Sequence, residues 1–191
     1  MNDRDATYPN KINKFFTEQT LKQHMKQFNI RKKVKSIDLF VQALTHLSYM
    51  KSRYTLSAHS ETIVGFKEKS NEKLIFLGKN LYRYLLSKYI FRRYFDQSSE
   101  FLDKIIEEMT KDENYVYTGK IMKHSGLKEY ILISRGIENK IGRNDMNLLS
   151  DFYYAFLAAL SMDSGINVAE NYNNSSMEKH IDFGKIVRNL N

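Results

Sequence analysis

The chain has 191 residues, of which 42% are hydrophobic and 13% aromatic, and it carries a formal charge of +8 with a pI near 9.4. This composition is typical of a one-domain globular protein and excludes a disordered one. The positive charge favours an anionic partner, nucleic acid first and a membrane surface second, with a merely basic soluble protein as the alternative. The sequence contains no cysteine, which excludes disulfides, thiolate zinc sites and cysteine nucleophiles.

The first twenty residues give no clear targeting signal. They include Asp3, Asp5 and Glu18 and lack an apolar run after a basic start. They therefore do not resemble a secretory signal, and they match an acid-poor mitochondrial presequence badly. No stretch of the sequence reaches the roughly 18 consecutive apolar residues of a membrane-spanning helix, so we expect no membrane span.

Residues 1–35 are expected to form an N-terminal extension. After a polar tail, the apolar positions of residues 12–30 fit an amphipathic helix. A basic segment then places four cations within five residues, at Arg31, Lys32, Lys33 and Lys35. This segment is either a solvated loop or a phosphate-binding one.

Residues 36–49 are predicted to form a short helix, and residues 50–70 a long polar loop. His46 lies near the end of this helix, and we expect it to make a structural hydrogen bond rather than to act in catalysis.

Residues 71–94 are predicted to form one long helix. The apolar side chains that recur at spacings of three and four are Leu74, Leu77, Leu81 and Leu85. Further apolar residues, Ile75, Phe76 and Tyr82, lie outside this stripe, so we expect a second face of the helix to be covered as well.

The rest of the chain also favours helices. Residues 98–117 and 115–124 are predicted helical, with Gly126 just beyond the end of the second. Residues 127–133 are either a strand or a helical turn, and residues 135–147 are predicted to be a loop. Residues 148–162 are apolar nearly all round and are expected to form the buried central helix, while residues 166–191 form a C-terminal tail. The predicted fold class is all-α.

Four segments, in this order, resemble segments of the ribonuclease III family: ALTHLSY at 43–49, NEKLIFLG at 71–78, residues 114–143, and LLSDFYYAFLAALSMDSG at 148–165. The resemblance covers residues 36–165 and implies an all-helical ribonuclease III-like domain. It also implies dimerisation through the helix at 71–94, with Ile75, Phe76 and Tyr82 in the interface. Because 26 residues follow Gly165, we do not expect the double-stranded-RNA-binding domain that usually follows in this family.

The chemistry of the family depends on carboxylates that hold divalent metal for the cleavage of double-stranded RNA. The resemblance places these carboxylates at four positions, which in this chain are Ile75, Lys79, Asp151 and Tyr154. Glu72 matches a further acidic position. We therefore expect a degenerate site with no catalytic residue, no metal and no other cofactor. In its place we expect an ion pair between Lys79 and Asp151, closer than about 6 Å.

The chain resembles the degenerate ribonuclease III-like proteins of the mitochondrial large ribosomal subunit in its size, its basicity and the replacement of its metal-binding carboxylates. This implies a non-catalytic structural RNA-binding protein in the mitochondrial matrix, with ribosomal RNA, ribosomal proteins and a second ribonuclease III-like domain as partners. RNA contacts are expected at basic positions: Arg31, Lys32, Lys33, Lys35, Arg92, Arg93, Lys67, Lys69 and Lys73.

Two alternatives remain open. One is a non-catalytic subunit of an RNA-processing or RNA-editing complex. The other is an active double-stranded-RNA endonuclease with a rearranged site, completed by a partner's carboxylates or built from Glu72, Asp151, Asp145 or Asp163.

Overall fold

The computed structural model describes residues 10–31, 34–54, 70–111 and 116–190. Within these ranges the chain is a bundle of helices, and its one β-type pairing is an isolated parallel bridge between Thr45 and Leu132. The predicted all-α fold is confirmed. The elements are α1 (Glu18–Lys26), α2 (Ile37–Ala43), α3 (Leu47–Tyr54), α4 (Glu72–Arg93), α5 (Ser99–Thr110), α6 (Val116–His124), the 3-10 helix η3 (Leu127–Tyr130), α7 (Arg135–Lys140), α8 (Met146–Ser164), α9 (Ile166–His180) and α10 (Phe183–Leu190).

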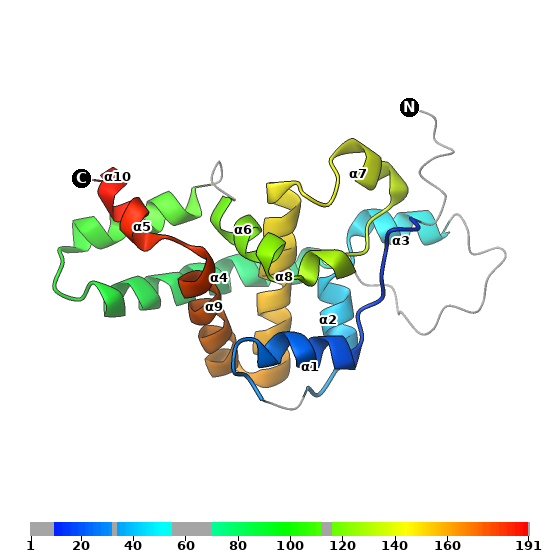
Figure 1. Cartoon of the computed structure of the whole chain (residues 1–191), viewed down its shortest axis with the longest axis horizontal. Helices are drawn as coiled ribbons and strands as arrows, with labels where there is room; N and C mark the ends of the chain where they lie inside the picture. The colour runs from blue at the N-terminus through cyan, green and yellow to red at the C-terminus, as the bar shows by residue number, and fades with distance from the viewer. Residues whose placement is uncertain (1–9, 32–33, 55–69, 112–115, 191) are drawn as a thin grey trace.

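Helix α8 runs through the middle of the bundle, with α2, α4, α6 and α9 packed around it (Figure 1). Between residues 148 and 160, every residue except Asp151 is buried. The helix begins at a cap, where the Asp145 carboxylate accepts a hydrogen bond of 2.8 Å from the Leu148 N–H. It ends before Gly165, whose φ of 95° stops the helical path. The predicted buried central helix is confirmed.

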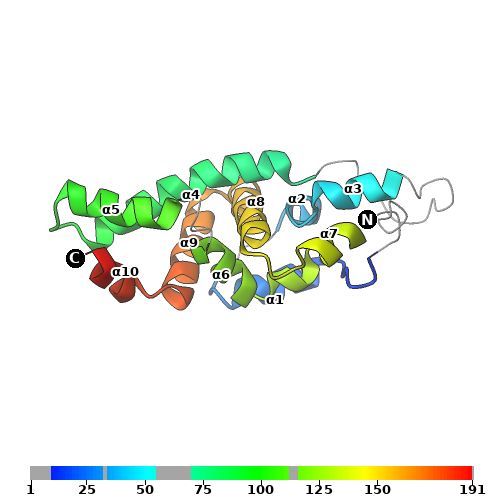
Figure 2. The ribbon, with the colours of Figure 1, turned by 90° about the horizontal axis from the view of Figure 1, so that it is seen from above.

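Helix α4 lies along one side of the molecule, with α1 and α6 on the opposite side of α8 (Figure 2). The predicted apolar stripe of α4 is partly wrong, because Leu77 is 42% exposed and Leu81 is half-buried. A close approach to α8 at Gly78 turns a neighbouring row of residues inward instead. The buried row runs through Asn71, Leu74, Gly78, Tyr82, Leu85 and Tyr89.

The segment before residue 36 contributes to the core through α1. This helix is shorter than the predicted one because it starts after Thr17, whose side chain accepts a hydrogen bond from the Thr20 N–H. Leu21 and Met25 of α1 are buried in the core cluster. Ahead of α1, the Asn13 side chain donates to the Ile133 carbonyl at 3.0 Å and ties this segment to the middle of the chain.

Residues 36–49 form two helices rather than one. Between α2 and α3, the Leu44 carbonyl accepts a hydrogen bond from the Leu132 N–H at 2.7 Å, and the His46 N–H donates to the Leu132 carbonyl at 2.9 Å. Backbone groups committed to this pairing cannot continue a helix. The same pairing settles the form of residues 127–133, which are a 3-10 turn followed by the bridge.

Residues 135–147, predicted to be a loop, contain helix α7. The Ser134 hydroxyl caps it by accepting from the Ile137 N–H at 3.2 Å. A buried ion pair of 2.7 Å between Arg143 and Glu138 then holds the helix to the turn that follows. The glycines at positions 136 and 142 indicated a loop, but the cap and the ion pair decide the local structure.

The residues after 165 form α9 and α10. Helix α9 packs against α8, α6 and α4, and α10 packs against α5. Tyr172 of α9 and Phe183 of α10 are buried. In the described part of the chain, no helix is both long and apolar enough to span a membrane.

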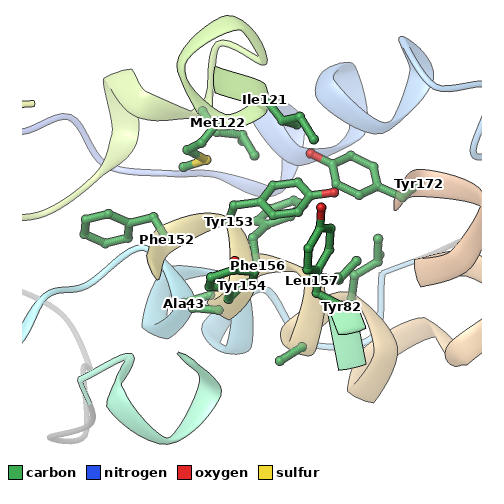
Figure 3. Packing of buried hydrophobic residues seen from close by; sticks show 14 of the residues in the cluster. Ala43, Tyr82, Ile121, Met122, Phe152, Tyr153, Tyr154, Phe156, Leu157 and Tyr172 are labelled. Carbon is green, nitrogen blue, oxygen red and sulfur yellow. The ribbon is translucent and has the colours of Figure 1, made fainter. Parts of the chain in front are cut away.

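The core contains a group of tyrosine rings (Figure 3). Tyr153 and Tyr172 stack with their centroids 6.4 Å apart, and the Tyr153 hydroxyl donates to Asn173 Oδ1 at 2.9 Å. The Tyr172 hydroxyl lies 3.0 Å from His24 Nε2 of α1. Burial lowers the pKa of His24 to about 4, so the imidazole is neutral in the folded chain at neutral pH.

Candidate functional site

Helices α4 and α8 touch backbone to backbone where they cross. A Cβ added at Gly78 would collide with the carbonyl group of Tyr154. Glycine is therefore needed here for close approach rather than for an unusual backbone angle. The crossing brings positions 75 and 79 of α4 next to positions 151 and 154 of α8, where the resemblance places the metal-binding carboxylates.

The centre of this crossing is occupied by an ion pair. Lys79 Nζ lies 3.1 Å from Asp151 Oδ1, so the predicted ion pair is confirmed. The two side chains are 43% and 37% exposed, which makes the pair a partly solvated one. The Lys79 ammonium also lies 5.8 Å from the centroid of the Tyr154 ring, within the range of a cation–π contact.

Ile75 and Tyr154 offer no carboxylate to the crossing. Ile75 is half-buried and packs against the core. Tyr154 is 7% exposed, and its hydroxyl accepts a hydrogen bond of 3.3 Å from Thr118. The Thr118 hydroxyl also contacts the Ser150 hydroxyl, so the three polar groups satisfy one another. Tyr154 therefore acts as a packing residue with a bonded hydroxyl.

Glu72 lies at the start of α4, exposed, where its carboxylate accepts a hydrogen bond of 2.9 Å from the Ser70 hydroxyl. A carboxylate in the first turn also interacts favourably with the helix dipole. These contacts account for Glu72 without a bound metal.

His46 lies near both acidic residues, between α2 and α3. Its Nδ1 accepts the Ser48 N–H at 3.1 Å, so the neutral ring carries its proton on Nε2. Burial lowers the pKa of His46, while the charges of Asp151 and Glu72 act in the opposite direction. The expected structural hydrogen bond is confirmed. No role at the crossing was predicted for His46, and its place within the ALTHLSY motif was the one sequence feature that could have indicated it.

The donor set at the crossing does not fit a divalent metal ion. Magnesium is bound by several convergent oxygens, whereas positions 75, 79 and 154 supply a hydrocarbon, an ammonium and a bonded phenol. In the part of the chain that the structure describes, no group of three or more His, Asp or Glu side chains is placed to hold a metal. Two other acidic residues have structural contacts: Asp145 caps α8, and Asp163 Oδ1 accepts the backbone N–H groups of Lys35 and Ser36 at 2.9 and 2.8 Å.

The described residues among those expected to contact RNA have different surroundings. Arg31, Lys35 and Lys73 are exposed. Arg92 and Arg93 are exposed as well, but each has a partner within the chain: Arg92 pairs with Glu170 at 2.8 Å, and Arg93 donates to the Tyr89 hydroxyl at 2.9 Å and packs over the Phe183 ring. The remaining positions, Lys32, Lys33, Lys67 and Lys69, lie outside the described residues.

The expected interface on α4 needs one correction. Tyr82 is 1% exposed and packs against Tyr153 and Tyr154 in the core, so it cannot contact a partner. Phe76, by contrast, is 75% exposed. The exposed apolar face of α4 is formed by Phe76, Leu77, Tyr84 and Phe91. We call this set the outer face of α4.

Comparison with known sequences gives a consistent match. A family model described as Ribonuclease-III-like matches residues 36–180. A "Probable ribonuclease 3" of Acanthamoeba polyphaga mimivirus is 29% identical over 185 residues, which are 94% of this chain and 34% of that protein. "Ribonuclease 3" of Clostridium perfringens (strain 13 / Type A) is 33% identical over 135 residues, which are 70% of this chain and 50% of that protein. The chain thus spans between a third and a half of the length of these relatives.

Solved structures show the same fold. The nuclease domain of ribonuclease III from Campylobacter jejuni is similar with a TM-score of 0.64 and 23% identity, covering 84% of this chain and 98% of that one. That structure is described by its flexibility in a region involved in dimer formation. A second structure of the same domain, at 2.2 Å resolution, has a TM-score of 0.65 and 21% identity, covering 87% of this chain and 98% of that one.

Proposed function

The chain belongs to the ribonuclease III-like family, and on this premise we propose that it is a non-catalytic RNA-binding protein that uses the family's fold as a structural subunit. The observation that supports this most is the contact of 3.1 Å between Lys79 and Asp151. It places an ammonium against the one carboxylate present among the four positions that the family resemblance assigns to metal binding.

Electrostatics explains why this contact matters. A dication entering the crossing would meet one carboxylate, and it would be repelled by the Lys79 charge at short range. Moving Lys79 away would still leave Ile75 and Tyr154 without oxygen anions to offer. Hydrolysis of a phosphodiester in this family needs a water activated by a bound metal. The crossing therefore lacks the oxygen ligands that would hold such a metal.

RNA binding is supported by charge. The formal net charge is +8, and exposed cations include Arg31, Lys35 and Lys73. Contacts of this kind are made to phosphates, so binding should follow backbone shape and depend strongly on salt, without base readout.

The exposed apolar residues on the outer face of α4 are evidence for a protein partner. Leu77, Tyr84 and Phe91 are spaced seven residues apart and lie exposed along one helix, a spacing typical of a helix-to-helix seam. The Campylobacter jejuni nuclease domain is described as forming dimers. We propose that the outer face of α4 contacts a second ribonuclease III-like domain, in another copy of this chain or in a related protein.

In its narrower form, the proposal places the protein in the mitochondrial large ribosomal subunit; the alternative is an RNA-processing or RNA-editing complex. Sedimentation through a sucrose gradient of increasing salt separates the two. The ribosomal form predicts co-migration with large subunits that persists at high salt, whereas the alternative predicts migration with smaller particles.

An active endonuclease is the second candidate. It is favoured by the closeness of Asp151 and Glu72 to His46, on whose pKa both act, and by the names of the relatives. It predicts metal-dependent cleavage of double-stranded RNA that Asp151→Asn abolishes.

The direct test of the proposal is a binding titration with double-stranded RNA over a range of salt. We expect the logarithm of the association constant to fall linearly with the logarithm of salt concentration, and Asp151→Asn to leave the curve unchanged. Absence of binding at low salt, in the presence of the partner subunit, would contradict the proposal.

A further inference from the structure

A pocket of about 270 Å³ lies between α6 and α10, beside the end of α9. Its lining residues come from α6 and from the segment that runs from the end of α9 into α10 (helices labelled in Figures 1 and 2), and none belongs to the outer face of α4. None of the residues selected from the sequence as RNA-binding lines it. Its volume is close to the lower end of the range for small-molecule sites in proteins.

The polar side of this pocket is basic. Lys120 of α6 and Lys185 of α10 both line it, on facing elements. Among the described residues, neither lysine forms an ion pair. Two ammonium groups that line one pocket and form no ion pair among the described residues favour a bound anion.

His180, at the end of α9, lines the same pocket. Its ring stacks on His124 of α6, with centroids 5.9 Å apart and planes at 23°. Its Nε2 is shielded from water and has no hydrogen-bond partner in the described part of the chain. A buried ring nitrogen without a partner is costly, and an oxygen acceptor beside it would remove that cost.

The pKa of His180 reflects its burial and the groups near it. Burial lowers its pKa, and Lys179, His124 and Lys120 lower it further. Lys120 and Lys185 outnumber the one acidic lining residue among the described residues, Asp182, so the charged side chains of the pocket carry a net positive charge.

Most of the uncharged lining is apolar. It consists of Val116 and Tyr117 of α6 together with Ile181 and Ile186, and we call these four residues the apolar side. The one acidic lining residue in the described chain, Asp182, uses Oδ1 to accept the Lys185 N–H at 2.9 Å at the start of α10. Its carboxylate is thus engaged with the backbone.

We propose that this pocket binds a nucleoside monophosphate group, with the phosphate held by Lys120 and Lys185 and the nucleoside against the apolar side. The combination of two lining lysines, a buried imidazole nitrogen without a hydrogen-bond partner among the described residues and apolar lining residues in a cavity of this size supports the assignment. The group is either a free nucleotide or the 5′-terminal nucleotide of an RNA strand. In the second case the inference deepens the proposed RNA-binding function and rests on it.

Calorimetric titration of the full chain with AMP, adenosine and inorganic phosphate tests the proposal. We expect AMP to bind and adenosine to bind at least about tenfold more weakly, because the charged contacts are lost. In the Lys120→Gln/Lys185→Gln variant AMP affinity should fall by about tenfold or more.

The matched control is Lys123→Gln, which removes the same charge from the same helix at an exposed position that does not line the pocket. It should bind AMP within about twofold of the parent chain, since a distant surface charge is screened by salt. Circular dichroism confirms that each variant is folded. Equal binding of AMP and adenosine, no binding of AMP, or unchanged binding by the double variant would overturn the proposal.

Two RNA duplexes identify the source of the phosphate. A preference for a 5′-phosphorylated duplex over its 5′-hydroxyl twin, lost in the double variant, assigns the pocket to an RNA end. AMP binding without such a preference assigns it to a free nucleotide. If the chain binds both duplexes equally, with or without the two lysines, and does not bind AMP, the proposed RNA-binding function is retained and nucleotide binding in the pocket is refuted. If the chain binds AMP but neither duplex, nucleotide binding in the pocket is retained and the RNA-binding function is refuted.

Discussion

Gly78 of α4 lies directly against the backbone carbonyl of Tyr154 in α8, with no room for a side chain between them. This contact fixes how the two helices cross. It therefore also fixes which residues of α4 face Asp151, and Lys79, next in sequence to Gly78, reaches that carboxylate at 3.1 Å.

Gly78→Ala should destabilise the fold strongly. The new methyl group would collide with backbone atoms of a helix that is buried on nearly all sides, so the helices must separate. We expect the free energy of unfolding to fall by about 3 kcal/mol or more. Urea unfolding followed by circular dichroism measures it. Gly184→Ala is the matched control, because its methyl group would meet flexible side-chain atoms in α10, and it should change stability by less than about 1 kcal/mol.

Restoring carboxylates at the crossing should create metal binding. Ile75→Glu combined with Lys79→Asp puts two carboxylates beside Asp151 and removes the ammonium. Thermal unfolding with and without Mn²⁺ detects the site, since saturation to 100 times Kd stabilises by about 2.7 kcal/mol. We expect a rise in Tm for this variant and none for the parent chain. Adding Asp151→Asn should remove the rise; an equal rise in the parent chain would contradict the account of the crossing.

His24 should make stability depend on pH in a defined window. Its pKa is about 4 in the folded chain against 6.5 ordinarily, so between these values the unfolded chain binds a proton that the folded chain does not. The contribution of the neutral imidazole to the free energy of unfolding is therefore complete above pH 6.5. It decreases by about 3 kcal/mol as the pH falls towards 4. The measurement is denaturant unfolding across this window. Comparison with His24→Gln isolates the effect, because the variant lacks this proton; parallel pH curves for the two chains would refute it.

The outer face of α4 should control association. Phe76 is 75% exposed, and Phe76→Glu places a charge where an apolar partner surface would lie. We expect the variant to lose at least about tenfold in affinity for its partner domain. Sedimentation velocity over a concentration series measures this. Val116→Glu, at an exposed position of α6, is the control and should associate as the parent chain does.

The sequence predicted much of this fold because its strongest patterns coincide with the tightest packing. The run at 148–162 is apolar nearly all round, and every residue of α8 between 148 and 160 except Asp151 is buried. The ion pair was predictable because a lone carboxylate on such a helix needs a partner, and Lys79 was the cation that the family resemblance placed beside it.

Other features of the structure depend on tertiary contacts, which the spacing of apolar residues in the sequence does not reveal. The predicted apolar stripe through Leu77 was partly wrong because a glycine contributes nothing to a hydrophobic pattern. Gly78 nevertheless determines which side of α4 faces α8, through its close contact with Tyr154. Helix α7 was missed because its cap and the Arg143–Glu138 pair are tertiary features. The pocket at α6 and α10 could not be predicted, since Lys120 and Lys185 are brought together by the fold alone.

The most direct test of the central claim is cleavage of double-stranded RNA by the purified chain, together with its partner domain, in Mg²⁺ or Mn²⁺. The ammonium of Lys79 against Asp151, with Ile75 and Tyr154 beside it, predicts no cleavage above background and no difference between the parent chain and Asp151→Asn. Metal-dependent cleavage by the parent chain that disappears in Asp151→Asn would contradict the claim that this domain is non-catalytic.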